Sequence, residues 1–402
     1  MTKRERSLLI VACYGHFMSH FNMMVFPAVL LPLSARLGLE MADTLGLSFL
    51  MYLLFGLSAL PWGFLADRFG PRKLLSVFHL GAAVCAFGAA MCIDRPALFS
   101  FALAGTGLFS GIYHPAGLGW IARETEKTST AMAINGMFGN LGLAAAPFIA
   151  GIINYFYSID TLYIVVSGMN LLGLVFLLPG RAGVTGGGGK KHSVPVKVNS
   201  FSSWTPFYIL LVAMMLGGIV YRGTSVTLPS YFELKNGGLF DFLTRLTGGM
   251  GSANVTATLF TSIIYIGGMA GQFFGGMVGE KYDLRGSYFL FHAITIPAAI
   301  GMALTANIPL IFFAILHGFF LLGMQPIENT LVARLTPPKL ISSAYGMKFI
   351  LTFGVGALSV KIIKMIKLHW GIECVFYALA AVSLLICLVI VFLWRKTSER
   401  EL

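Results

Sequence analysis

Histidines inside long apolar stretches are the residues of this sequence whose type and spacing point most directly to chemistry. His16 and His20 stand four residues apart, so on a helix they share one face. His114 lies in another apolar stretch and is followed by Pro115, which kinks a helix and frees a carbonyl one turn earlier. A buried imidazole can exchange protons, contact a solute or bind a transition metal. The alternative is that these histidines hydrogen bond to neighbouring helices and serve packing alone.

The histidines are expected at comparable depth if both stretches are helical. His114 precedes Arg123 by nine residues, or about 14 Å at 1.5 Å per residue, and His16 follows Arg6 by ten residues. Asn22 follows in the first stretch, about 200° round the helix from His20. We include Asn22 with the three histidines among the residues of a substrate or proton cavity.

Charged and amide side chains also interrupt apolar stretches in the second half of the chain. These residues include Arg222, Gln325, Glu328 and Lys348. Glu328 lies six residues before Arg334, and Lys348 lies six residues inside its own stretch, so both should lie about 9 Å inside the same surface. An unpaired charge within a membrane costs at least ~2.5 kcal/mol. We therefore predict that Glu328 and Lys348 pair or share a partner, either for proton and solute exchange or as a purely structural bridge.

The elements that position these residues follow from composition. The chain has 402 residues, of which 57% are hydrophobic and only 11% charged, whereas a soluble domain carries about a quarter charged residues. A membrane-spanning helix needs ~20 apolar residues, and alternating strands of the kind that build a membrane barrel do not occur. The sequence therefore predicts an all-α integral membrane protein with twelve spans, near residues 8–33, 44–66, 73–92, 97–121, 129–153, 161–179, 205–230, 255–279, 288–304, 309–333, 342–360 and 372–394.

Basic residues predict the orientation of these spans. The net charge of +12 would favour nucleic acid as a partner of a soluble protein, but here most Lys and Arg outside the spans fall on the side of the N-terminus. Positive residues stay on the cytoplasmic side. We therefore expect both termini in the cytoplasm, the lipid bilayer as a partner, and no nucleic acid.

A glycine-bounded basic stretch, residues 63–73, lies between two spans. We expect the preceding helix to end at Ala66, and Asp67 to accept hydrogen bonds from the N-terminus of a neighbouring helix, where the dipole favours an anion. Arg68, Arg72 and Lys73 are expected to meet acidic lipid headgroups or a facing carboxylate.

The second half repeats these features. Glu280, Lys281 and Arg285 follow each other with the same spacing as Asp67, Arg68 and Arg72, and the pair Gln325-Pro326 mirrors His114-Pro115. Residues 180–204 form a polar stretch with four consecutive glycines followed by two lysines, which is typical of a flexible linker. The sequence therefore predicts parallel repeats, with a six-helix bundle at 1–179, a cytoplasmic linker at 180–204 and a second six-helix bundle at 205–402.

Small residues and a proline mark the fifth span. Gly142, Pro147 and Gly151 occur there, with alanine at positions 146 and 150. Small residues let two helices approach closely. Ordinary helix packing is the simpler interpretation, and a role in conformational change is the functional one.

These motifs resemble those of known transporters. Gly63, Asp67, Arg68, Gly70, Arg72 and Lys73 resemble the loop between helices 2 and 3 of the major facilitator superfamily. Gly142, Pro147 and Gly151 partly resemble the antiporter motif of its exporters. Three further patches look like the fosmidomycin resistance protein family of exporters, although Met23 stands where that family often has an acid. The patches are Ser19-His20 with Asn22, Gly105-Thr-Gly with His114-Pro115, and the prolines after Arg222.

The resemblance implies that spans 1, 4, 7 and 10 line a central cavity. It places six residues around that cavity: His16, His20, His114, Arg222, Gln325 and Glu328. We add Asn22 and Lys348 to the predicted cavity residues. The resemblance also implies that nine other residues take part in gating. These are Asp67, Arg68, Arg72, Lys73, Glu280, Lys281, Arg285, Gly142 and Pro147. The same resemblance places the protonatable group at His20, His114 or Glu328 instead of the missing acid.

We predict a monomeric secondary transporter of the bacterial inner membrane, a proton-coupled exporter of a small drug-like or anionic solute by alternating access. Motifs for nucleotides, nucleophiles and metalloproteases do not occur, so we expect no enzyme and no cofactor. One alternative is a transporter of a transition metal or metal chelate, with His16, His20 and His114 as ligands. Another is a membrane receptor or scaffold that moves no solute.

Overall fold

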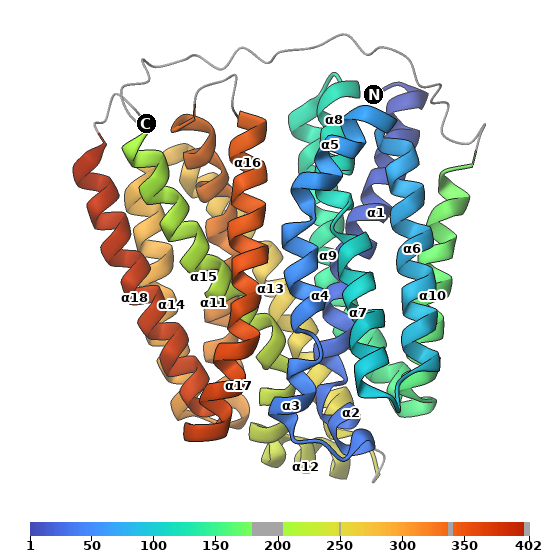
Figure 1. Ribbon diagram of the computed structural model, residues 1–402. Helices are drawn as coiled ribbons and strands as arrows, with labels where there is room; N and C mark the ends of the chain where they lie inside the picture. Colours follow the sequence, from blue (N-terminus) through green and yellow to red (C-terminus); the bar gives the residue numbers. More distant parts are fainter. Residues whose placement is uncertain (179–203, 249–250, 337–340, 398–402) are drawn as a thin grey trace. The chain divides into compact units, whose positions relative to one another are not determined.

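The protein is described by a computed structural model that covers residues 1–178, 204–248, 251–336 and 341–397 (Figure 1). Within those ranges every regular element is a helix, so the all-α prediction is confirmed. The chain divides into two compact units, one within residues 1–194 and the other within 195–402. Apart from Trp204, the predicted linker at 180–204 lies outside the described residues, so the linker and the limits of the two bundles stay predictions.

The first unit is coloured blue to green in Figure 1. Its helices are α1 (Lys3–Ala28), α2 (Leu30–Leu37), α3 (Met41–Gly46), α4 (Phe49–Leu57), α5 (Ala59–Phe69), α6 (Pro71–Met91), α7 (Pro96–Ser110), the π-helical turn η1 (His114–Leu118), α8 (Gly119–Glu124), α9 (Thr128–Phe156) and α10 (Ile159–Phe176).

The second unit runs from lime green to red. Its helices are α11 (Thr205–Lys235), α12 (Gly237–Leu246), α13 (Ala253–Lys281), α14 (Leu284–Leu304), α15 (Asn307–Arg334), α16 (Ile341–Phe349), the π-helical turn η3 (Ile350–Gly354), the short 3₁₀ turn η4 (Val355–Ala357), α17 (Leu358–Trp370) and α18 (Glu373–Lys396).

Most of these helices are long and apolar enough to cross a membrane. Among the described residues eleven helices meet this condition, and a bent pair, Leu30–Leu37 with Met41–Leu57, brings the number to as many as twelve. The predicted second span at 44–66 is divided among α3, α4 and α5. Pro61 has no N–H to donate to the Leu57 carbonyl, and α4 ends at Leu57. The sequence pattern gave the length of this segment but not its breaks.

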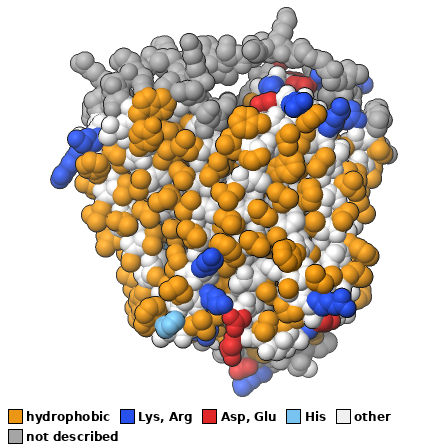
Figure 2. All heavy atoms as spheres, in the orientation of Figure 1, with side chains coloured by type: hydrophobic (Ala, Val, Ile, Leu, Met, Phe, Trp, Pro, Cys, Tyr) orange, Lys and Arg blue, Asp and Glu red, His pale blue; other side chains and the backbone are white. Residues whose placement is uncertain are grey.

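Hydrophobic side chains cover the outside of both units between their charged ends. On the face shown in Figure 2, orange apolar groups occupy most of the middle, and Lys, Arg, Asp and Glu gather mainly near the ends. Phe64, Phe101 and Phe273 are about two thirds exposed or more, at 68%, 67% and 73%. Apolar exposure on this scale is incompatible with water but suits lipid tails.

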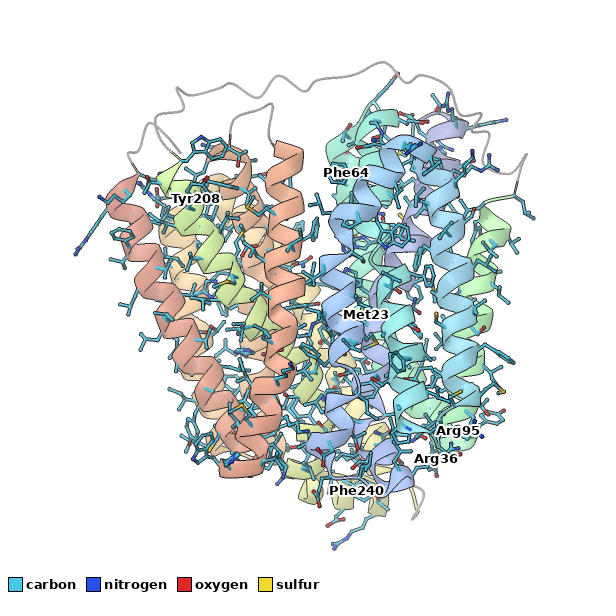
Figure 3. The ribbon with its side chains drawn as sticks, viewed as in Figure 1. Met23, Arg36, Phe64, Arg95, Tyr208 and Phe240 are labelled. Carbon is cyan, nitrogen blue, oxygen red and sulfur yellow. The ribbon has the colours of Figure 1, made fainter. Side chains whose placement is uncertain are left out.

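Charged residues mark the end of the first unit that lies opposite the N-terminus. Phe64 lies at the end that holds the N-terminus, whereas Arg36 and Arg95 lie at the opposite end (Figure 3). Arg36 donates hydrogen bonds to both carboxylate oxygens of Asp94, at 2.8 and 2.9 Å, and the guanidinium holds the pKa of Asp94 below its usual value. Arg36 and Arg95 therefore belong to the minority of basic residues outside the spans that lie opposite the N-terminus. The side of the membrane that this end faces stays a prediction.

Close packing of α1 against α9 explains the small residue at position 142. A Cβ atom added to Gly142 would lie 2.3 Å from the carbonyl oxygen of Phe17, a main-chain atom that cannot move aside. Pro147 lies within α9 one and a half turns further on. The predicted close helix contact at Gly142 is confirmed, while a gating role for Gly142 and Pro147 stays a prediction.

Candidate functional site

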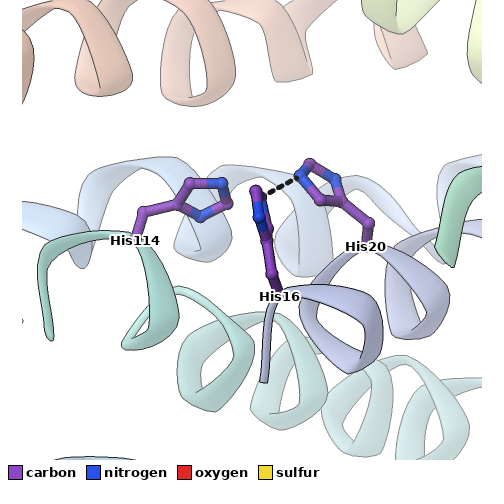
Figure 4. Close-up of side chains that lie close together, drawn as sticks. All are labelled: His16, His20 and His114. Carbon is purple, nitrogen blue, oxygen red and sulfur yellow. Dashed lines mark hydrogen bonds between the residues drawn. The ribbon is translucent and has the colours of Figure 1, made fainter. Parts of the chain in front are cut away.

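Three histidines of the first unit meet between α1 and η1. His16 and His20 come from successive turns of α1, and His114 is the first residue of η1. Figure 4 shows the three imidazoles pointing toward one another, with His16 in the middle. His16 and His114 are buried, His20 is half-buried, and one ring nitrogen from each lies within 4.8 Å of the others. The structure thus brings together His16 and His114, which the sequence had placed at comparable depth, and His20, which was predicted to share a helix face with His16.

The main chain of α9 orients His16. Its Nδ1 lies 2.9 Å from the carbonyl oxygen of Asn135, and because a carbonyl can only accept, Nδ1 carries the proton. In neutral His16 the lone pair is then on Nε2, which lies 3.2 Å from Nε2 of His20. His20 therefore donates its Nε2–H to His16 when both rings are neutral.

A tyrosine that sequence reasoning did not single out supports the same ring. Tyr113 stacks on His16 with ring centroids 4.8 Å apart and an angle of 19°. The Tyr113 hydroxyl exchanges hydrogen bonds with the Asn135 side chain, at 3.0 and 2.7 Å. The position of Tyr113, directly before His114, was the only available signal, because the sequence does not reveal which helix faces it.

The backbone at His114 departs from an α-helix. α7 ends at Ser110, and residues His114–Leu118 form the π-helical turn η1 with Pro115 as its second residue. The predicted proline kink is therefore a local widening of the helix. Such π-helical turns are frequent at functional sites. This one holds the His114 ring nearly perpendicular to the other two imidazoles, at interplanar angles of 88° with His16 and 86° with His20.

Asn22 belongs to a different polar group. Its amide donates to Ser110 Oγ at 3.0 Å and to Asn170 Oδ1 at 3.2 Å, and Asn170 donates back to Asn22 Oδ1 at 3.0 Å. These contacts connect α1 to α7 and α10. Asn170 escaped sequence reasoning, and a cavity role for Asn22 stays a prediction.

Glu328 and Lys348 form a buried ion pair in the second unit, which confirms the pairing predicted from their depth. Nζ of Lys348 lies 2.6 Å from Oε1 of Glu328, and their side chains are 9% and 6% exposed. Tyr288 of α14 donates a hydrogen bond to Glu328 Oε2 at 2.9 Å. Lys348 also donates to Asn329 Oδ1 at 2.5 Å. The carboxylate and the ammonium are thus both hydrogen bonded in a place with little exposure to solvent.

The other predicted cavity residues of the second unit lie on α11 and α15. Arg222 of α11 is 3% exposed, and its guanidinium lies 5.8 Å from the centre of the Tyr221 ring. Gln325 of α15 accepts a hydrogen bond from Gln272 of α13 at 2.7 Å. A single cavity shared by these residues and the three histidines stays a prediction.

One group of predicted gating residues lies around the junction of α5 and α6. α5 continues to Phe69 instead of ending at Ala66, because Gly70 adopts a φ of 88° and Pro71 begins α6 at once. Asp67 therefore lies in the last helical turn and accepts a hydrogen bond from the Arg123 guanidinium at 2.8 Å. The predicted partner of Asp67, a helix N-terminus, was wrong.

Arg72 and Arg285 occupy equivalent places in the two units. Arg72 donates to the carbonyl oxygen of Leu177, after α10, at 3.2 and 2.6 Å. Arg285 donates to the carbonyl oxygen of Thr397, after α18, at 2.9 Å. Both arginines thus cap the C-terminus of the last helix of their unit, where carbonyls lack helical partners. The expectation that Arg72 meets a lipid headgroup or a carboxylate did not include this contact.

The remaining gating candidates lie on the surface. Arg68 lies 5.3 Å from the centre of the Phe69 ring. Lys73, Glu280 and Lys281 are exposed near the ends of their helices. Their gating roles stay predictions.

Each helical unit has an apolar outer surface; the first contains the three histidines and the second contains the buried ion pair. These features are typical of a multi-pass integral membrane protein of the transporter type. A model of the Major Facilitator Superfamily matches residues 12–257 and 242–402. The chain therefore belongs to the Major Facilitator Superfamily. It is a secondary transporter and not an enzyme, and the receptor or scaffold alternative is set aside.

Individual relatives agree with this membership. The uncharacterized MFS-type transporter YhjO of Bacillus subtilis (strain 168) is 23% identical over 337 residues, which cover 79% of this chain and 76% of the relative. A bacterial homologue of the human lysosomal transporter Spinster, inward-facing and unoccupied, matches with a TM-score of 0.72 and 14% identity over 98% of each chain. A POT family transporter in complex with a thioalcohol-conjugated peptide matches with a TM-score of 0.78 and 15% identity, over 98% of this chain and 96% of that one. At these identities the two structures support the fold alone.

Proposed function

We propose that this transporter is a proton-coupled exporter of a small drug-like or anionic solute in the bacterial inner membrane, with both termini in the cytoplasm. The observation that carries the proposal is the buried pair of Glu328 and Lys348 at 2.6 Å. Ionisable residues within spans are costly and are retained mainly where they serve transport.

The chemistry of the pair suits coupling to protons. A proton that reaches Glu328 neutralises the carboxylate and removes its attraction to Lys348, which then lacks a counter-charge. The Tyr288 hydroxyl holds the second carboxylate oxygen at 2.9 Å, so the pair and its partner connect α14, α15 and α16. Protonation therefore changes the energy of contacts among three helices, which is the type of event that shifts a two-state equilibrium.

The solute class rests on Arg222. Its guanidinium stays charged at any physiological pH, and its side chain belongs to a residue that is 3% exposed within α11. A guanidinium recognises carboxylate and phosphate groups through paired N–H donors, so a solute that contacts Arg222 is expected to carry a negative group. Support for export comes from the resemblance of the stretches around His20, His114 and Gly142 to motifs of exporters.

Proton flux in proteoliposomes tests the coupling. The purified chain is reconstituted with a pH-sensitive dye inside, and gradients of small phosphonates, carboxylates and cationic drugs are imposed in turn. We expect one class to drive proton movement. Glu328→Gln should abolish that movement while solute–solute exchange continues. The control Asp241→Asn, an exposed carboxyl on α12, should behave as wild type. Wild-type proton movement in Glu328→Gln would contradict the proposal.

Vesicle orientation tests the direction. In everted membrane vesicles with an acidified interior, an exporter that exchanges protons for solute accumulates the solute inside. Accumulation only in right-side-out vesicles would show import instead.

A second candidate function is supported by the histidine cluster, namely transport of a transition-metal ion or its chelate. Its test is flux of Zn²⁺ into liposomes that contain a zinc-sensitive dye. Zinc flux that stops in His16→Ala would favour it over the first proposal.

A further inference from the structure

We propose that His16, His20 and His114 form a binding site for one transition-metal ion of the Zn²⁺ type, held by three imidazole nitrogens with a fourth position open to water or an anion. The proposal concerns binding, and it stands independently of proton coupling at Glu328. It rests on the distances among the three rings and on the groups that orient them.

The nitrogen atoms are spaced as a tetrahedral ion requires. With Zn–N bonds of about 2.1 Å, two ligand nitrogens of a tetrahedral ion lie roughly 3.4 Å apart. The Nε2 atoms of His16 and His20 lie 3.2 Å apart, and the ligand atoms of all three residues lie within 4.8 Å of one another. Only the third nitrogen has to approach, by roughly 1 Å or a little more, which a small rotation of the side chain supplies.

The middle ligand is already oriented. Histidines that bind metals usually donate their other N–H to a carbonyl or carboxylate, which fixes the tautomer and leaves the lone pair facing the ion. His16 has this arrangement, since its Nδ1 donates to the Asn135 carbonyl at 2.9 Å. Tyr113 stacks on the same ring at 4.8 Å and keeps it from rotating.

Binding needs no net loss of protons. In neutral His20 the Nε2–H points at His16, and a shift of this proton to Nδ1 frees Nε2 for the ion without releasing a proton to solvent. The site contains only neutral ligands, so a divalent ion keeps its full charge in a membrane span. That charge makes an anionic fourth ligand favourable, and three histidines with one open position are a known arrangement for zinc.

A glycine on α9 makes room for the site. A Cβ atom added to Gly139 would lie 2.6 Å from Cε1 and Nε2 of His16, so an alanine there displaces the ring. Gly136, one turn earlier on the same helix, has no atom within 4 Å of its added Cβ. The pair offers a perturbation of the site that leaves all three ligands in the sequence, together with a matched control.

Calorimetry with ZnCl₂ and absorption spectroscopy with CoCl₂ test the proposal on full-length protein purified with a histidine-free tag. We expect one ion per chain, and Co²⁺ spectra of low-coordinate geometry with nitrogen ligands. His16→Ala and His114→Ala should weaken binding by at least about 100-fold, more than the loss of an outer partner. His20→Gln should weaken it less than His16→Ala. His369→Ala, which removes an exposed histidine of α17, should bind as wild type.

Folding controls keep the result decisive. Each variant is compared with wild type by size-exclusion chromatography and circular dichroism, and Gly139→Ala should weaken Zn²⁺ binding about 10–100-fold while Gly136→Ala does not. Four results would each overturn the proposed site. They are no saturable binding of Zn²⁺, a Co²⁺ spectrum of a six-coordinate ion, His16→Ala binding Zn²⁺ as tightly as wild type, and His369→Ala losing as much Zn²⁺ affinity as His16→Ala. Proton-coupled flux measured in metal-free buffer reports on Glu328 alone, so failure of one proposal is distinguishable from failure of the other.

Discussion

Neutralising Lys348 alone should destabilise the protein more than neutralising Lys348 and Glu328 together. At 2.6 Å and an effective dielectric constant of 20, the two charges attract each other by about 6 kcal/mol. Desolvation of each ion costs several kcal/mol, so the pair contributes little net stability. Removing one partner is different, because the remaining charge stays buried and uncompensated, at a cost of roughly 3–5 kcal/mol.

The expected sizes follow from this difference. Lys348→Met should lower the free energy of unfolding by about 3–5 kcal/mol. Lys348→Met/Glu328→Gln should recover most of the loss, because the amide oxygen of glutamine still accepts the hydrogen bond that Tyr288 gives to Glu328 at 2.9 Å. The matched control is Arg123 with Asp67, a pair of similar length at 2.8 Å whose side chains are 48% and 70% exposed. Its single and double neutralisations should each change stability by at most about 1 kcal/mol.

Equilibrium unfolding in mixed micelles with increasing dodecyl sulfate measures these free energies. The two double-mutant cycles are run in the same micelles, so that the detergent environment is identical for the buried pair and the exposed pair. If Lys348→Met and the double variant lose the same stability, Glu328 does not hold a buried uncompensated charge and the reasoning fails. If the exposed pair shows coupling as large as the buried pair, burial is not the cause.

Two further predictions concern the first unit. Gly136→Ala should raise the thermal unfolding temperature, since alanine favours a helix by up to about 1 kcal/mol. Gly139→Ala should lower this temperature, because the new methyl group would lie 2.6 Å from the His16 ring. Equal shifts of the unfolding temperature in the two variants would contradict the clash. Asn22→Leu should lower the free energy of unfolding by about 1–3 kcal/mol, because it leaves Oδ1 of Asn170 without the N–H that Asn22 donates at 3.2 Å. Asn22→Leu/Asn170→Leu should recover part of this loss. A double variant no better than the single one would argue against the amide pair.

The positions along each helix could be predicted from the sequence. The pairing of Glu328 with Lys348 followed from counting 1.5 Å per residue and from the cost of a lone charge in lipid. The same counting placed His16 and His114 at one depth, and the structure brings their nitrogens together. Both inferences needed only the helical rise, which hardly varies between proteins.

Lateral contacts could not be predicted in this way. Which side chains become partners depends on which helices are neighbours and on how each helix is rotated. Examples are the contacts of His16 with Asn135, of Asn22 with Asn170 and of Glu328 with Tyr288. Asn135 was visible as a polar residue within a span, but nothing in the sequence assigned it to His16.

Local breaks were also beyond the pattern. The hydrophobic stretch at 44–66 has the length of one span, and hydropathy does not register that Pro61 has no N–H to donate to the Leu57 carbonyl. At Phe69, Gly70 and Pro71 the helix end was misplaced because Asp67 and Arg68 were taken for loop residues, although a helix tolerates charges in its last turn once it reaches the membrane surface.

The internal repeat separates structural from functional residues. Arg72 and Arg285 cap the last helix of each unit in the same way, so both units retain this device. The clusters of ionisable side chains differ, because three histidines meet in the first unit whereas a carboxylate pairs with an ammonium in the second. Packing requirements act equally on two copies of one bundle, whereas a single solute or ion has no reason to contact both copies identically. The positions where the repeats diverge inside their spans are therefore where function is to be sought, and both of our proposals lie there.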